Sequence, residues 1–138
     1  MSRRHRAPGR AGIAMLTAGA ALALAACGGM MPDHELQKFT SRFGDVEFGM
    51  SKTRVQYTMG VPKQRLYSGN QEAWLWCETS NSPRQPDAFM TVYFHKAQVA
   101  GIHTYGNRAE GLCETFFRPV EWLADPEKAL EAKVRRRE

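Results

Sequence analysis

The sequence predicts an α+β protein in which two short helices precede three or four antiparallel strands. Before residue 60 the apolar side chains recur at helical spacing, whereas from residue 63 onward they follow the two-residue alternation of strands. Turn residues separate the strand segments at short intervals, which is typical of hairpins. We therefore expect two short N-terminal helices packed on a three- to four-stranded antiparallel sheet, followed by a C-terminal aromatic segment and a helix.

Residues 1–26 have the parts of a secretion signal: a basic start with four arginines, then an uncharged run rich in alanine and glycine. The letters LAAC at residues 24–27 resemble the bacterial lipobox. In that motif the cysteine thiol receives diacylglycerol, the chain is cut before it, and the freed amine is acylated. The resemblance implies that Cys27 is the lipidated first residue of the mature protein, and that residues 27–32 form a flexible lipidated leader.

Two other interpretations of this segment stay open: a soluble protein cut after Ala26, and a retained membrane helix. The apolar run has about 16 residues, short of the roughly 20 that span a bilayer, whereas two or more acyl chains anchor a protein durably. Gly28 follows the cysteine, where an aspartate would resemble the inner-membrane retention signal of many Gram-negative bacteria. We therefore expect an anchor in membrane lipid at the periplasmic face of the outer membrane.

The remaining chain has the length of one domain and a small net charge. Without residues 1–26, 112 of the 138 residues remain. The formal net charge of +5 includes the four signal arginines and no signal acid, so it falls to +1 for residues 27–138. Because a strong basic excess is the usual mark of nucleic-acid binding, we expect no nucleic acid partner. We assign residues 33–122 to the α+β domain and residues 123–138 to a C-terminal helix and charged tail.

Capping residues place the two N-terminal helices. Asp33 is a candidate N-cap for a helix that ends at Gly44. Ser51 is a candidate N-cap for a helix over residues 52–59, which ends at Gly60. The apolar residues expected on the buried faces are Leu36, Phe39 and Phe43 in the first helix, and Val55 and Met59 in the second.

Four segments have the pattern of strands: residues 65–67, 72–79, 89–94 and 99–105. In the second of them, Trp74 and Trp76 share one face, whereas Ala73, Leu75 and Cys77 share the other. Both faces of this strand are therefore apolar, which is typical of a central strand or of one covered by a helix.

The compartment predicts how the cysteines pair. With Cys27 lipidated, only Cys77 and Cys113 remain, in surroundings that oxidise thiols. We predict a disulfide between them, which would stabilise the fold by roughly 4 kcal/mol on the chain-entropy model. The alternative is a pair of free or metal-binding thiols. A zinc site needs more ligands at short spacing, and the sequence has no C-x-x-C or H-x-x-x-H, so we expect no metal.

The C-terminal part carries an aromatic cluster and a basic end. The apolar side chains around Pro119 are Phe116, Phe117, Val120 and Trp122. We expect them to form a lid over one end of the core, and an exposed docking patch is the alternative. Asp125 and Pro126 are typical of a helix start. The basic residues at its end suit a solvated helix C-terminus, with attraction to anionic lipid headgroups as the alternative.

The sequence lacks the familiar motifs of catalysis. It contains no G-x-S-x-G, P-loop, dinucleotide fingerprint or metalloprotease helix. His95 and His103 fall on one predicted hairpin, but a slip of one residue would move either to the other face. Glu72 and Glu78 flank the tryptophans in the manner of a glycosidase pair, although scattered carboxylates are normally solvated. We therefore expect no catalytic residue, no cofactor and no enzymatic activity.

Residues 48–62, with the letters FGMSKTRVQYTMGVP, are similar to the opening signature of the SmpA/OmlA family, the small outer-membrane lipoproteins also called BamE. The motif residues are Gly49, Met50, Ser51, Val55, Gly60 and Pro62. The likeness continues through the strand with Trp74 and Trp76 and a strand that ends in a Val-x-Phe pattern, and it covers roughly residues 33–105. The same unit is similar to the repeat of beta-lactamase inhibitor proteins. Since each motif residue has a structural role, the motif specifies a fold more strongly than an activity.

The resemblance implies an accessory lipoprotein of the outer-membrane β-barrel assembly machinery, which acts by contact with partner proteins and without turnover. The predicted disulfide and the aromatic segment after it depart from the family pattern. The alternative is a periplasmic binding or inhibitor module on the same fold, unrelated to barrel assembly, that grips another protein with its sheet. An exposed patch of Trp74, Trp76 and Tyr93 would favour that alternative, because aromatic anchors dominate protein interfaces. These three are the candidate partner-binding residues.

Overall fold

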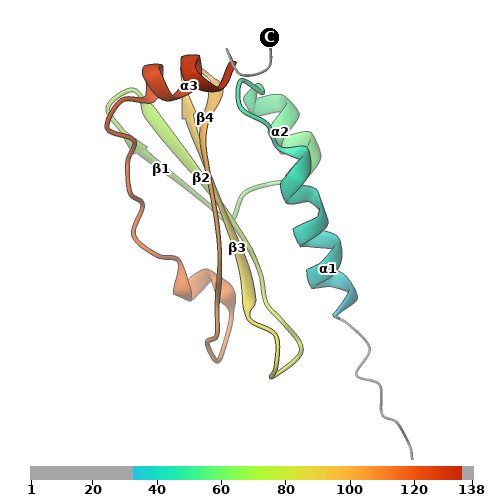
Figure 1. Ribbon diagram of the computed structural model, residues 1–138. Coiled ribbons are helices and arrows are strands. Elements are labelled where there is room, and N and C mark those ends of the chain that lie inside the picture. Colours follow the sequence, from blue (N-terminus) through green and yellow to red (C-terminus); the bar gives the residue numbers. More distant parts are fainter. Residues whose placement is uncertain (1–32, 135–138) are drawn as a thin grey trace, which may run out of the picture.

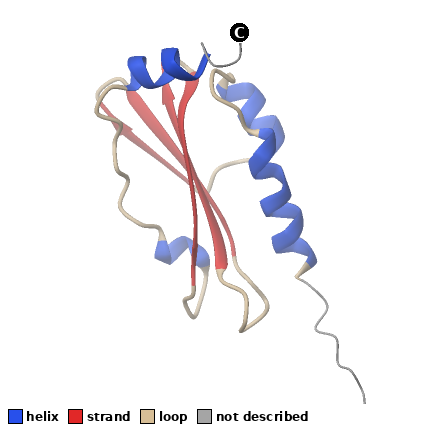
Figure 2. Cartoon of the chain, viewed as in Figure 1, coloured by secondary structure: helices blue, strands red, loops and turns tan. Residues whose placement is uncertain are grey.

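The computed structural model describes residues 33–134. Within them the chain is α+β, with three α-helices and one four-stranded antiparallel sheet in the order β1-β2-β3-β4 (Figures 1 and 2). The elements are α1 (His34–Ser41), the 3-10 helix η1 (Arg42–Asp45), α2 (Lys52–Met59), β1 (Gln64–Ser68), β2 (Gln71–Glu78), β3 (Asp87–His95), β4 (Gln98–Asn107), the 3-10 helix η2 (Cys113–Phe116) and α3 (Pro126–Val134). The α+β class and the antiparallel sheet agree with the sequence prediction.

The predicted caps form in the structure. The Asp33 carboxylate accepts the Leu36 N–H at 3.2 Å, and the Ser51 hydroxyl accepts the Arg54 N–H at 3.3 Å. Gly60 ends α2 with φ 84°, a value in the region that favours glycine. The first helix is shorter than predicted, because its last turn tightens from α into the 3-10 helix η1.

The sheet is a simple up-and-down meander with β2 and β3 at its centre. Each strand pairs antiparallel with the next along the chain. The turn between β3 and β4 has positive φ at two successive residues, 49° at Lys96 and 63° at Ala97. That is the backbone pattern of a type I′ turn, whose twist matches that of the flanking strands. In the strand order β1-β2-β3-β4, the two edge strands are β1 and β4.

The two faces of the sheet carry separate apolar clusters. On the first, which we call the helix face, the buried strand residues are Trp74, Trp76, Ala88, Met90, Val92, Phe94 and Val99. Buried side chains of both N-terminal helices, Leu36, Phe39, Val55 and Met59, belong to the same cluster. On the opposite face, which we call the second face, Ala73, Leu75 and Tyr93 form one cluster and the two cysteines with Phe89 form another. The alternation predicted for the tryptophan strand is confirmed.

The chain after β4 returns along the second face (Figure 1). Phe117 approaches the Phe89 ring edge-on at 5.8 Å between centroids, and Trp122 approaches Tyr93 in the same way at 6.4 Å. Val120 and Leu123 pack against the cluster formed by Ala73, Leu75 and Tyr93. The aromatic segment is thus a cover of the second face rather than a lid on one end of the core, and its rings are partly buried rather than displayed as a docking patch.

Several predictions concern residues outside the described part of the chain. The signal over residues 1–26, the lipidated Cys27, the leader over residues 27–32 and the last residues of the basic tail all lie there. Over residues 33–134, each helix is too short or too polar to cross a membrane.

Candidate binding surface

The tryptophans predicted to contact a partner lie in the core instead. Trp74 and Trp76 are 4% and 2% exposed, and their ring centroids are 5.9 Å apart. Trp74 also packs against Phe94 at 4.7 Å. The exposed tryptophan patch that would favour the binding or inhibitor module is absent from the described residues, because α1 and α2 contribute apolar side chains to the cluster on this face of β2.

Tyr93 is the third predicted anchor, and it is likewise unavailable. It is 5% exposed and lies on the second face, beneath Trp122 of the returning segment. Burial is also the largest influence on its hydroxyl and raises the pKa of Tyr93. Because Tyr93 and the tryptophans point to opposite faces of the sheet, the three residues do not form one surface.

A buried carboxylate joins β2 to α2. Glu72 is 9% exposed and accepts hydrogen bonds from the Lys52 ammonium and from the Trp74 indole N–H. Burial pushes the pKa of Glu72 up, but the hydrogen bonds from Lys52 and Trp74 and the Lys52 charge outweigh it, so the pKa lies below its usual value. The ionised form of Glu72 is therefore the one that the fold stabilises.

Replacement of Glu72 by glutamine should cost stability at neutral pH and less in acid. A carboxyl whose pKa is lower in the folded chain stabilises the fold above its unfolded value, here 4.5, and loses that contribution as pH falls through the folded pKa. We expect Glu72→Gln to lower the free energy of unfolding by about 1–3 kcal/mol at pH 7. Chemical denaturation at pH 7 and pH 3 measures it, with the exposed Glu110→Gln as the control. An equal cost at both pH values would contradict the assignment.

The exposed aromatic side chains of the helix side lie around α2 and β1. Tyr57 of α2 is 86% exposed and Tyr67 of β1 is 68% exposed. A hollow of about 400 Å³ lies beside Tyr57, and Trp74 and Lys52 also line it. The Arg65 guanidinium of β1 lies 4.3 Å from the centroid of the Trp74 ring. It also donates to the Gln56 amide oxygen at 3.4 Å, which links β1 to α2.

This region is also electropositive, and we call it the α2–β1 surface (Arg54, Gln56, Tyr57, Arg65 and Tyr67). Helix α2 contains no acidic residue. Within residues 33–134, no ion pair neutralises Arg54 or Arg65, whereas the Lys52 charge is matched by Glu72. Exposed tyrosine and arginine side chains together are typical of the centres of protein interfaces.

The sequence contains a signal for the exposure of Tyr57. Val55 and Met59 mark the buried face of α2, and Tyr57 lies two residues from each, about 200° around the helix. A tyrosine at that position must point to solvent when the other two are buried. Tyr67 carried no comparable signal, because its exposure depends on β1 being the edge strand.

The residues that resemble the SmpA/OmlA motif have structural roles. Gly49 has φ 81°, and Val55 is fully buried. Backbone groups of residues 49 and 50 bond to Val99 of β4, the Gly49 N–H to its carbonyl at 2.8 Å and the Met50 carbonyl to its N–H at 2.9 Å. The roles of Ser51 and Gly60 at the helix ends are described above, and Pro62 is buried beyond the exit. Most of these residues therefore help to place α2 against the sheet.

The histidines and carboxylates considered for catalysis are not brought together. His95 is 3% exposed, with its Nε2 3.6 Å from Glu127 of α3, whereas His103 is exposed beside the Tyr105 ring. His103 pairs across the sheet with Thr91, far from His95 in the register. Glu72 and Glu78 are six residues apart on an extended strand, or about 20 Å. That separation exceeds the roughly 5–9.5 Å of glycosidase carboxylates.

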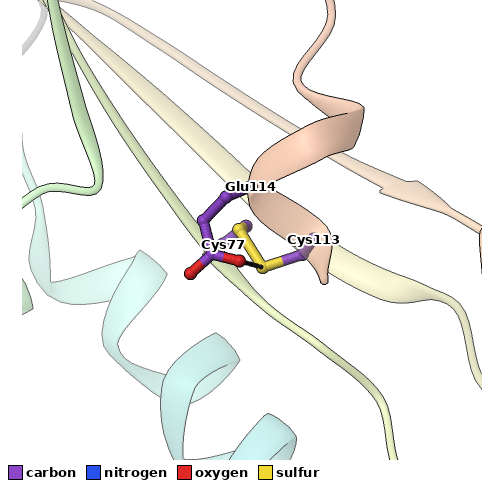
Figure 3. A group of neighbouring side chains, drawn as sticks. All are labelled: Cys77, Cys113 and Glu114. Carbon is purple, nitrogen blue, oxygen red and sulfur yellow. Dashed lines mark hydrogen bonds between the residues drawn. A yellow bond between two sulfur atoms is a disulfide. The ribbon is translucent and has the colours of Figure 1, made fainter. Parts of the chain in front are cut away.

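Cys77 and Cys113 are joined by the disulfide that the sequence indicated, with an S–S distance of 2.04 Å (Figure 3). Both cysteines are buried, at 3% and 2% exposure. The Glu114 carboxylate lies 3.8 Å from the Cys113 sulfur and pairs with Lys63 at 2.9 Å. These three groups are close enough together to hold a metal ion, but a cysteine binds a metal as its thiolate, and the sulfurs of Cys77 and Cys113 are joined in a disulfide.

Comparisons of the chain with protein-family models, with curated proteins and with solved structures find no match. Membership of the SmpA/OmlA family therefore stays a prediction from the residues of the motif.

Proposed function

We propose that this protein is an outer-membrane-anchored lipoprotein that binds other proteins without catalysis, as an accessory factor in the assembly of outer-membrane β-barrels. The proposal includes lipidation at Cys27 and the packing of the two N-terminal helices on the sheet. The observation that carries protein binding is the α2–β1 surface, where Tyr57 and Tyr67 are exposed and where no ion pair within residues 33–134 neutralises Arg54 or Arg65. The part played in barrel assembly rests on the resemblance of residues 48–62 to the SmpA/OmlA signature.

The distribution of apolar side chains supports this choice of surface. The middle of the helix face and the middle of the second face are both covered by the chain's own side chains, so a partner cannot pack on the centre of either face. Burying Tyr57 and Tyr67 against a partner would remove apolar area that folding leaves in water. The positive charges of Arg54 and Arg65 favour a partner whose contacting surface is acidic.

Affinity recovery of the full-length protein from cross-linked native membranes tests the proposal. Mass spectrometry should identify components of the β-barrel assembly machinery, and the Cys27→Ala variant should lose most of that recovery because the anchor concentrates both partners at one membrane. The same variant should also leave the membrane fraction. Recovery of one unrelated periplasmic protein, without the machinery, would support the binding or inhibitor module instead and reject the part in barrel assembly.

A further inference from the structure

The outer edge of β4 is an unprotected sheet edge. β4 has ten residues and is paired only on the side of β3 over most of its length. The C-terminal part of β4, from Ile102 to Asn107, has the letters IHTYGN, with no lysine, proline or acidic residue. Those residue types, bulges and short length are the usual means of protecting an edge from another strand. The opposite edge, β1, has five residues and carries Arg65.

The same edge already accepts an extended segment of this chain. Residues 49–52 run beside the start of β4, with the hydrogen bonds to Val99 described above, a Lys52 N–H to Ala97 carbonyl bond at 3.3 Å, and an antiparallel bridge between Ser51 and Gln98. The backbone hydrogen bonds from this segment reach Ala97 and Val99. Within the described part of the chain, no hydrogen bond outside the β3–β4 ladder satisfies the backbone groups from Ile102 to Asn107.

Strand alternation identifies the unpaired groups. Val99 bonds outward to residues 49 and 50, and it lies opposite Phe94. Val92 is two residues before Phe94 on β3, so its backbone groups have the same orientation as those of Phe94. Because of the register shift between Tyr93 and Phe94, the residue of β4 opposite Val92 is Ile102. The outward groups of β4 therefore belong to Ile102, Thr104 and every second residue after them.

A hollow lies on each side of this edge. On the helix face, a groove of about 480 Å³ runs between α1 and β4 and is lined by Leu36, Phe43, Pro86 and Ala88 beside Thr104 and Gly106. On the second face, a hollow of about 300 Å³ lies beside Gly101 and His103, with Phe48 and Leu123 in its wall. A strand added to β4 would send alternate side chains into these two hollows.

We propose that the outer edge of β4, from Ile102 to Asn107, is a second docking site, which takes an extended segment of a partner protein as a fifth strand. The partner segment carries apolar side chains at alternate positions, because those opposite Thr104 and Gly106 enter the apolar groove. The β4 edge of a second copy of this chain fits poorly as the added strand. Its helix-face residues are Ile102, Thr104 and Gly106, so only one of the three has an apolar side chain to enter the groove. The proposal goes beyond the proposed function and does not depend on the α2–β1 surface.

Photo-cross-linking along the strand tests the proposal in native membranes. A photoreactive residue replaces Ile102, His103 or Thr104 in turn in the full-length protein, and mass spectrometry maps the linked residue of the partner. We expect the linked position to move along one alternating apolar segment by about one residue for each step along β4. Links to a second copy of this chain, links to lipid, links scattered over the partner, or no links would each overturn the proposal.

Two variants separate strand addition from ordinary contact. Thr104→Pro removes an outward N–H without breaking the β3–β4 ladder, and its ring obstructs an incoming strand, so cross-linking from position 102 should fall about tenfold or more. Thr104→Lys places a charge in the apolar groove and should have a similar effect if the proline variant fails to fold. Thr104→Ser is the matched control and should retain the cross-link. Undiminished cross-linking from position 102 in both Thr104→Pro and Thr104→Lys would reject strand addition. Recovery of the β-barrel assembly machinery without cross-links from β4 would reject this docking site and leave the proposed function unaffected.

Discussion

Trp74→Ala should lower the free energy of unfolding by about 4 kcal/mol or more, the largest effect we expect of a single substitution in this protein. The side chain is 4% exposed and packs against Trp76 and Phe94. Its indole N–H also donates to Glu72. Alanine would therefore leave a large cavity and remove one of the hydrogen bonds that hold a buried carboxylate.

Denaturant unfolding measures this effect, and two variants serve as controls. Trp74→Phe keeps most of the ring volume but loses the indole donor, so it should cost about 1–2 kcal/mol. Tyr57→Ala removes an aromatic side chain that is 86% exposed and should change stability by less than about 0.5 kcal/mol. A stable, folded Trp74→Ala variant that loses only partner binding would mean that Trp74 is an interface residue after all.

Replacing Cys77 and Cys113 together by alanine should cost roughly 4 kcal/mol. The disulfide closes a loop with a sequence separation of 36 residues, so its loss frees much of the unfolded chain. It also fixes the start of the segment that covers the second face, where Phe116 and Phe117 pack beside the two cysteines. We therefore expect this segment to become more accessible to protease than β2 or β3 in the double variant.

A reductant provides the control for the disulfide. Under reducing conditions in denaturant, the unmodified protein should unfold with the midpoint of the double variant, and the double variant itself should not respond. Peptide mapping without reduction should recover the Cys77 and Cys113 peptides linked. Two free thiols in the protein taken from its native compartment, or a double variant as stable as the unmodified protein, would show that the bond does not hold the fold.

Local patterns predicted most of the secondary structure, because the residues concerned interact with near neighbours. Asp33, Ser51 and Gly60 act at helix ends within three or four residues of themselves. The alternation around Trp74 and Trp76 follows from strand geometry alone, and the apolar character of both faces predicted a central strand. These features needed no knowledge of which distant segments meet.

What the sequence left undecided depends on how the two sheet faces are covered. An aromatic pair on a strand has the same pattern whether a helix covers it or a partner does, so the exposure of Trp74 and Trp76 could not be settled locally. The same holds for the segment around Trp122, which lies against Tyr93 only because the chain returns along the second face. The hydrogen bond between Lys52 and Glu72 joins residues 20 apart in the sequence.

A photoreactive residue at position 57 tests whether a partner protein docks on the α2–β1 surface, as we propose. In native membranes, the full-length protein should cross-link from position 57 to an acidic segment of one partner protein. The same photoreactive residue at Leu112, also exposed at 69% but outside that surface, should give little of this product. Equal cross-linking from both positions, or links only to phospholipid, would contradict docking of a partner protein on the α2–β1 surface.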